Sequence, residues 1–149
     1  MSYNELRKGR ASIAGHIYLI TAVTTHRQPL FSELTLGRIV VNELRSLEKE
    51  YAAQTLAFVV MPDHLHWLMQ MGNTLSLSEV VKRCKGRSGM LITKALGKSG
   101  SIWQPAFHDH AVRHEESLIE IARYIVMNPV RAGLVARVED YSLWDSRWL

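Results

Sequence analysis

Two histidines separated by one residue are the first feature of this sequence that could carry chemistry. His64 and His66 flank Leu65 in the segment M-P-D-H-L-H-W-L-M. Alternate residues of a β-strand point to the same face, so a strand would project both imidazoles together and turn Leu65 into the core. Imidazole suits divalent transition ions, and the pair predicts half of a metal site. A half-exposed pair of strand histidines without a ligand is the alternative.

A tyrosine and an asparagine four residues apart could complete such a site. Tyr124 and Asn128 end an amphipathic stretch, and on a helix they would share one face, one turn apart. The phenol is a candidate nucleophile, and the amide oxygen is a candidate third metal ligand. Both residues also have structural alternatives. The Tyr124 ring could pack in the core, and Asn128 could cap a helical turn that begins at Pro129.

A second H-x-H, formed by His108, Asp109 and His110, competes for the metal role. In a ferredoxin-like sheet the last strand pairs with the first, which puts this segment two strand spacings, about 10 Å, from the strand that carries His64. One ion cannot be bound directly by both pairs at that separation. The apolar neighbours of His64 and His66 indicate the more rigid strand, so we expect this pair to bind the ion. Contact with the substrate is the role left open to His108 and His110.

The hydrophobic pattern predicts the elements that position these residues. Residues 15–25, 55–60, 64–71 and 102–113 have the composition of strands, and a hairpin is expected at Pro62. Residues 32–54 and 115–127 show helical periodicity. Another helix is expected from Ser76 or Ser78 to Leu96, with a break at Gly86 or Gly89. This order predicts an α+β fold, a ferredoxin-like antiparallel sheet with helices on one face plus a C-terminal helix carrying Tyr124.

Composition limits the class of protein. The chain has 149 residues, 47% of them hydrophobic and 21% charged, which is typical of one globular domain and predicts a single domain over residues 1–149. No apolar run approaches the roughly 20 residues that span a bilayer, so we expect no membrane partner. A single cysteine, Cys84, gives no disulfide framework and favours the cytoplasm.

Positive charge is clustered within a net charge of +4. Such clusters can neutralise phosphates, although a solvated helix face is the alternative. The residues expected to bind DNA are Arg7, Lys8, Arg10, Lys82, Arg83, Lys85, Arg87, Trp103, His110, Arg113 and Arg131.

Three segments resemble the REP-associated tyrosine transposases, which are part of the His-hydrophobic-His nuclease group. They are M-P-D-H-L-H-W-L-M, W-Q-P-A-F-H-D-H-A-V-R and Y-I-V-M-N-P-V-R-A-G-L-V, in this order. The resemblance implies a ferredoxin-like fold with His64 and His66 as metal ligands and Tyr124 as the nucleophile. Asn128 matches the polar residue that completes the metal site in that family.

The resemblance also implies a reaction. The substrate would be single-stranded, hairpin-forming repetitive DNA, cleaved and rejoined through a 5′-phosphotyrosine intermediate. A divalent ion, Mg²⁺ or Mn²⁺, would assist, and nitrogen ligands favour Mn²⁺. We expect a monomer in which the tyrosine acts in cis. Two alternatives stay open: a hairpin-binding relic that does not cleave, and a metal-dependent nuclease that uses water as the nucleophile.

Overall fold

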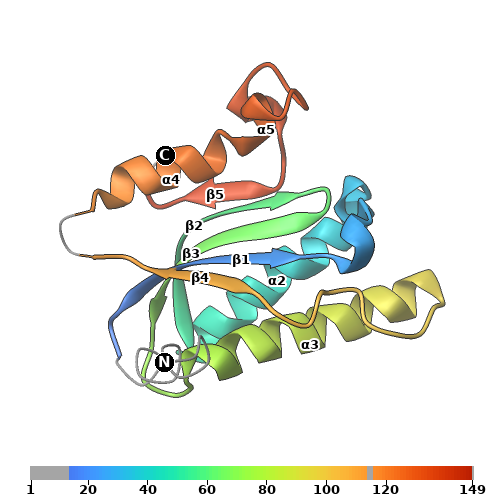
Figure 1. Cartoon of the computed structure of the whole chain (residues 1–149), viewed down its shortest axis with the longest axis horizontal. Coiled ribbons are helices and arrows are strands. Elements are labelled where there is room, and N and C mark those ends of the chain that lie inside the picture. Colours follow the sequence, from blue (N-terminus) through green and yellow to red (C-terminus); the bar gives the residue numbers. More distant parts are fainter. Residues whose placement is uncertain (1–13, 114–115, 149) are drawn as a thin grey trace.

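A five-stranded antiparallel sheet forms the centre of the molecule in the computed structural model, which describes residues 14–113 and 116–148. The strand order is β4-β1-β3-β2-β5 (Figure 1). The strands are β1 (Ile17–Val23), β2 (Ala53–Met61), β3 (His64–Met71), β4 (His108–Ala111) and β5 (Trp144–Ser146). β2 and β3 form the predicted hairpin, and β1 separates β3 from β4, as expected for the two H-x-H segments.

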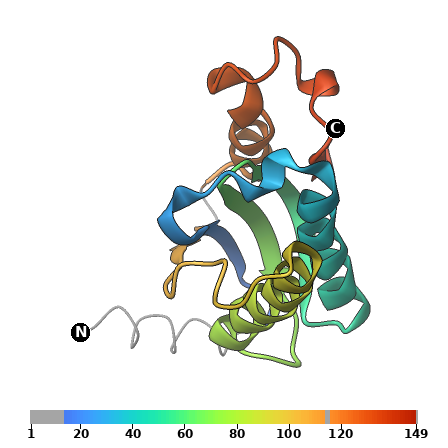
Figure 2. The ribbon, with the colours of Figure 1, turned by 90° about the vertical axis from the view of Figure 1, so that its right-hand side faces the viewer.

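Two long helices cover one face of the sheet. They are α2 (Leu34–Lys49) and α3 (Leu77–Leu96), which lie together on one side of the sheet (Figure 2). The sheet side chains that they bury include Tyr18, Ile20 and Trp67. The prediction that the first helix runs to residue 54 is wrong at its end. Tyr51 has a φ of 58°, in the left-handed region that stops a helix, and from Ala53 the chain is in β2.

The second helix is continuous, so the predicted break at Gly86 or Gly89 is also wrong. Its start is as expected: Glu79 N–H donates to the Ser76 hydroxyl at 3.2 Å, and Ser76 N–H donates to the Glu79 carboxylate at 3.1 Å. Arg87, between the two glycines, is paired with carboxylates of α2 and its C-cap. This tertiary contact outweighs the weak helix propensity of glycine.

The C-terminal part of the chain lies on the opposite face of the sheet. α4 (Leu118–Val126) buries Ala122 and Ile125 against Leu56, Val59 and Leu68 of β2 and β3. The short α5 (Asn128–Arg131) follows after Met127 (Figure 1). This arrangement confirms the predicted α+β fold with an added C-terminal helix.

Two features of the sheet edges differ from the prediction. Only His108–Ala111 of the expected strand 102–113 is in the sheet. Trp103 is buried and forms an isolated bridge to Thr24. β5 adds an unpredicted strand beside β2, so the C-terminal tail packs on the body of the protein.

Single-turn 3₁₀ helices occur at Thr25–Arg27, Leu30–Ser32 and Val138–Asp140. Across the described ranges, no helix combines the length and apolar character that crossing a membrane requires.

Candidate nuclease site

His64 and His66 lie side by side on the face of the sheet that α4 covers in part. They alternate with Leu65, which is buried on the opposite face. Their ring centroids are 4.7 Å apart and the ring planes are nearly perpendicular, at 80°. The predicted convergence of the two imidazoles is therefore present. Both residues are partly buried at the start of β3, next to the Pro62 turn.

Each imidazole is held through its Nδ1 atom. His64 Nδ1 lies 2.6 Å from Asp63 Oδ1, and His66 Nδ1 lies 2.9 Å from Thr21 Oγ1. Neither Nε2 atom has a recorded partner among the described residues. An imidazole that donates Nδ1–H to an oxygen presents an unprotonated Nε2, which is the form that binds a metal ion. Asp63 and Thr21 were not predicted from the sequence. Asp63 is signalled only by adjacency to His64, and Thr21 only by its register opposite His66.

The surroundings of the site lower the pKa of His66 and of Asp63, the partner of His64. Burial, then the charges of His64 and Arg131, lower the pKa of His66 to about 4, so the ring is neutral at neutral pH. Burial opposes ionisation of Asp63, but its hydrogen bonds and charge interactions with His64 and Arg27 outweigh that effect and lower its pKa. Arg27 Nη1 donates to Asp63 Oδ2 at 3.0 Å. The Asp63 carboxylate therefore lies behind His64, and the neutral ring of His66 lies beside it.

Tyr124 is an exposed residue on α4. Its side chain is 59% exposed, so the alternative of a core ring is excluded. The guanidinium of Arg131 stacks 3.9 Å from the centre of the phenol ring. Asn128 Nδ2 donates to the Ile125 carbonyl oxygen at 3.2 Å. The cap of α5 is Met127, so Asn128 does not serve as the N-cap that the sequence left open.

Several predicted DNA contacts are engaged within the protein. The prediction for Trp103 is wrong in this fold, because the side chain is 3% exposed and its Nε1 donates to Ser88 Oγ at 3.1 Å. Arg87 contacts Glu43 and Glu50, and Lys85 Nζ donates to the carbonyl oxygens of Gln104 and Ala106. These contacts hold α3 against neighbouring parts of the protein, so the side chains that make them are not free to contact DNA in this fold.

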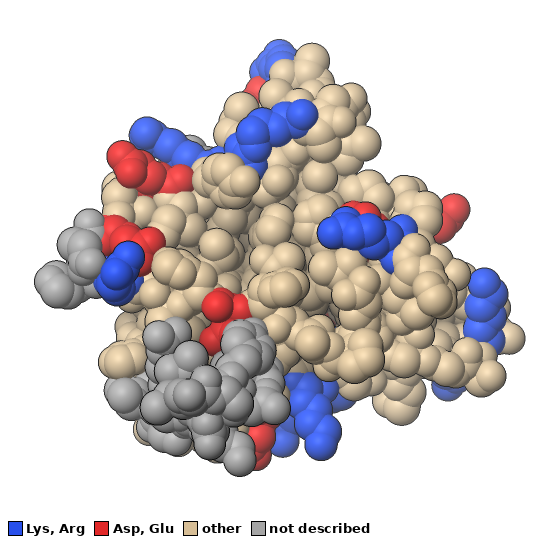
Figure 3. Space-filling model, in the orientation of Figure 1, with Lys and Arg blue, Asp and Glu red and all other residues tan. Residues whose placement is uncertain are grey.

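Other predicted contacts remain exposed. They are Lys82, Arg83, His110, Arg113 and Arg131; Arg7, Lys8 and Arg10 lie outside the described residues. His110 Nε2 is 3.0 Å from the Glu116 carboxylate, which also contacts Arg113 Nε at 3.6 Å. Thr21 is opposite His66 on one side and His108 on the other, so the three side chains share one face of the sheet. Basic side chains on the visible face form separate small groups rather than one patch (Figure 3).

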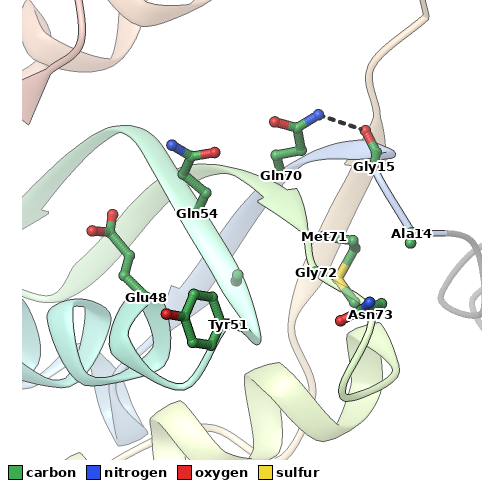
Figure 4. Close-up of a pocket in the computed structure, with 10 residues that line it drawn as sticks. Ala14, Gly15, Glu48, Tyr51, Gln54, Gln70, Met71, Gly72 and Asn73 are labelled. Atoms are coloured by element: carbon green, nitrogen blue, oxygen red, sulfur yellow. Dashed lines mark hydrogen bonds between the residues drawn. The ribbon is translucent and has the colours of Figure 1, made fainter.

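A hollow of about 560 Å³ lies at the other end of β3 from His64 (Figure 4). Glu48, Tyr51, Gln54 and Gln70 line it, and Gln70 Nε2 donates to the Gly15 carbonyl oxygen at 3.0 Å. Among the described residues, no histidine, cysteine or basic side chain lines this hollow. The candidate site is therefore taken to be the imidazole pair at the His64 end of the strand.

The chain matches a known family of transposases in sequence and in fold. The family model described as "Transposase IS200 like" matches residues 12–128, and the chain belongs to this family. The expectation of a transposase enzyme is therefore confirmed.

Individual relatives agree with this family. A REP-associated tyrosine transposase of Haemophilus influenzae is 29% identical over 144 residues, which cover 85% of this chain and 77% of the relative. A REP-associated tyrosine transposase of Escherichia coli is 34% identical over 87 residues. The aligned part covers 57% of this chain and 49% of the relative. A solved structure of a REP-associated tyrosine transposase bound to a REP hairpin superposes with a TM-score of 0.72 at 25% identity. The match covers 89% of this chain and 78% of that one.

Proposed function

We propose that this transposase cleaves and rejoins single-stranded, hairpin-forming DNA of the REP type through a covalent bond to Tyr124. The observation that carries the proposal is the pair of imidazoles on β3, each held by a separate oxygen, with an exposed phenol on the helix that packs across the same face. The solved relative bound to a REP hairpin supports the substrate class.

The residues present fit a divalent ion. His64 and His66 would hold it through their Nε2 atoms, because each Nδ1 is already occupied. Among the described residues, no group of three or more His, Cys, Asp or Glu side chains could hold a metal ion. The Asn128 amide oxygen and an oxygen of the DNA phosphate are the proposed further ligands. When bound, the ion, Mn²⁺ or Mg²⁺, would neutralise phosphate charge.

The covalent step exchanges one phosphate ester for another. Tyr124 Oη forms a bond to phosphorus as the bond from phosphorus to the 3′ oxygen breaks. The phenol loses its proton and the 3′ oxygen gains one. The products are a 5′-phosphotyrosine and a free 3′-hydroxyl, and the reverse reaction rejoins the strand.

The DNA would cross the open part of the sheet face. His108, His110 and Arg113 are exposed beside this face, and Lys82 and Arg83 offer a second set of phosphate contacts. Arg7 to Arg10 are proposed to add further contacts. We also propose that the protein acts as a monomer on nucleoid DNA in the cytoplasm, with its histidines and tyrosine in one chain.

A labelled single-stranded hairpin and Mn²⁺ test this proposal on a denaturing protein gel. The wild-type chain should form a protein–DNA adduct, and Tyr124→Phe should bind the hairpin without forming one. His64→Ala should lose cleavage with every divalent ion. Cleavage to a free 5′-phosphate without an adduct would identify water as the nucleophile. Tight binding without cleavage would identify a non-cleaving relic.

A further inference from the structure

Arg131 holds Tyr124 in two ways. Its guanidinium carbon is 3.9 Å from the centroid of the phenol ring, and its Nη2 donates a 2.5 Å hydrogen bond to the carbonyl oxygen of Tyr124 itself. The two residues are seven apart, two turns along the path from α4 into α5. One side chain therefore contacts both the ring and the backbone of the same tyrosine.

Little else restrains this ring. Tyr124 is 59% exposed, and the stack with Arg131 is its one recorded ring contact within the described ranges. An exposed aromatic side chain exchanges between rotamers, and each rotamer would move the phenol oxygen by several bond lengths. The hydrogen bond to the Tyr124 carbonyl oxygen holds the Arg131 guanidinium in place. A cation is also stabilised by the free carbonyl oxygens at the C-terminal end of a helix.

The same guanidinium acts on the histidine side of the site. Its positive charge is one of the causes of the low pKa of His66, after burial and the charge of His64. Arg131 is thus within electrostatic reach of both the phenol and the imidazole pair. Nη2 is the one nitrogen of Arg131 with a recorded partner among the described residues. The other N–H groups are left to bind an anion, and a planar fork of donors suits phosphate oxygens.

We propose that Arg131 is a positioning residue for Tyr124, which holds the phenol ring in line with the phosphate and donates to an oxygen of that phosphate. This inference rests on the proposed function, and it gives Arg131, predicted from the sequence only as a DNA contact, a role in positioning the tyrosine. Holding the reacting oxygen near phosphorus contributes to the rate rather than to the strength of DNA binding. Lysine would keep the charge but lose the planar stack and the fork.

The experiment measures the single-turnover rate of adduct formation at saturating hairpin DNA with Mn²⁺, using the full chain. Arg131→Ala should slow adduct formation by about tenfold or more, because the ring is released and a phosphate contact is lost. Arg131→Lys should recover only part of the rate. Arg123→Ala is the matched control, because Arg123 is an exposed arginine next to Tyr124. It should keep the wild-type rate.

Affinity is measured separately in the Tyr124→Phe background. There, Arg131→Ala should weaken hairpin binding by less than about threefold, since one phosphate contact among many is lost. Thermal melting checks the fold of each variant, and Arg131→Lys and Arg131→Gln carry the test if Arg131→Ala does not fold. An unchanged rate in the Arg131 variants, or a loss confined to affinity, overturns this inference alone. Absence of an adduct with the wild-type chain overturns the proposed function as well.

Discussion

At the scale of single residues, the site depends on oxygen atoms that orient the two imidazoles. Asp63 contacts His64 at 2.6 Å, and Thr21 contacts His66 at 2.9 Å. A carboxylate acceptor raises the basicity of the opposite nitrogen through its negative charge, whereas a hydroxyl partner is neutral. The two histidines should therefore differ in how much they depend on their partners.

Asp63→Asn should weaken metal-supported cleavage by about 10–100-fold, because the amide cannot supply the negative charge behind His64. The measurement is the rate of adduct formation against Mn²⁺ concentration, which should shift to higher concentrations. Asp140→Asn is the control, since Asp140 is exposed and far along the chain on a 3₁₀ turn. Equal metal dependence in the two variants would contradict a role for Asp63.

The low pKa of His66 predicts how stability changes with pH. The folded chain keeps His66 neutral down to about pH 4, whereas in the unfolded chain it gains a proton near its ordinary value of 6.5. Its contribution to stability is therefore present above pH 6.5 and lost as the pH falls toward 4. At pH 5 the protonation of His66 should lower the free energy of unfolding by about 2 kcal/mol relative to neutral pH.

Urea unfolding of the wild type and of His66→Asn at pH 7 and pH 5 measures this loss. The wild type should lose more stability than the variant between the two pH values. An equal loss in both proteins would mean that His66 is protonated as easily in the folded chain as in the unfolded one.

At the scale of elements, α2 and α3 are joined by a charged network. Arg87 Nε lies 2.7 Å from the buried Glu43 Oε1 as an ion pair, although the N–H is not aimed well enough for a hydrogen bond. Its two terminal nitrogens make a bidentate contact with Glu50. Burial raises the pKa of Glu43, and the positive charge of Arg87 offsets this rise only in part. Removing Arg87 would leave a buried carboxylate without its cation.

Arg87→Met should destabilise the fold by about 2–3 kcal/mol at pH 7 in urea unfolding, because Glu43 then ionises without a partner. This loss of stability is present where Glu43 is ionised, at a pH above its raised pKa. It becomes smaller as the pH falls and Glu43 gains a proton. Lys82→Met, at an exposed position on the same helix, should change stability by less than about 0.5 kcal/mol.

The same two variants separate packing from DNA contact on α3. Lys82→Met should reduce the slope of log affinity against log salt by about 1, since one phosphate contact is lost. Arg87→Met should leave the slope unchanged while the protein is folded. The reverse pattern would show that Arg87 leaves its carboxylates to bind DNA.

At the scale of the whole molecule, α4 packs on β2 and β3 of its own chain, and the charge of Arg131 from α5 reaches His66. This packing supports a tyrosine that acts in cis. A mixture of His64→Ala and Tyr124→Phe proteins should therefore form no more adduct than either alone. Restored adduct formation would place the tyrosine and the histidines of one site in different chains.

The sequence by itself determined the features that depend on local pattern. Period-two alternation placed His64 and His66 on one face and Leu65 on the other. The Ser76–Glu79 box set the start of α3, and the Tyr124 helix followed from apolar spacing. Order along the chain was enough to predict the sheet that separates the two H-x-H segments, because the ferredoxin-like connections leave few alternatives.

Only the tertiary structure decided which partner each side chain has. Thr21 meets His66 through strand register, and Arg131 reaches Tyr124 across the junction of α4 and α5. The sequence predicted Trp103 as an aromatic DNA contact, but this residue is buried against α3. It also placed Arg87 in a basic cluster, whereas the Arg87 side chain pairs with Glu43. The physical reason is that periodicity acts over a few residues, whereas burial and charge pairing depend on elements far apart in the chain.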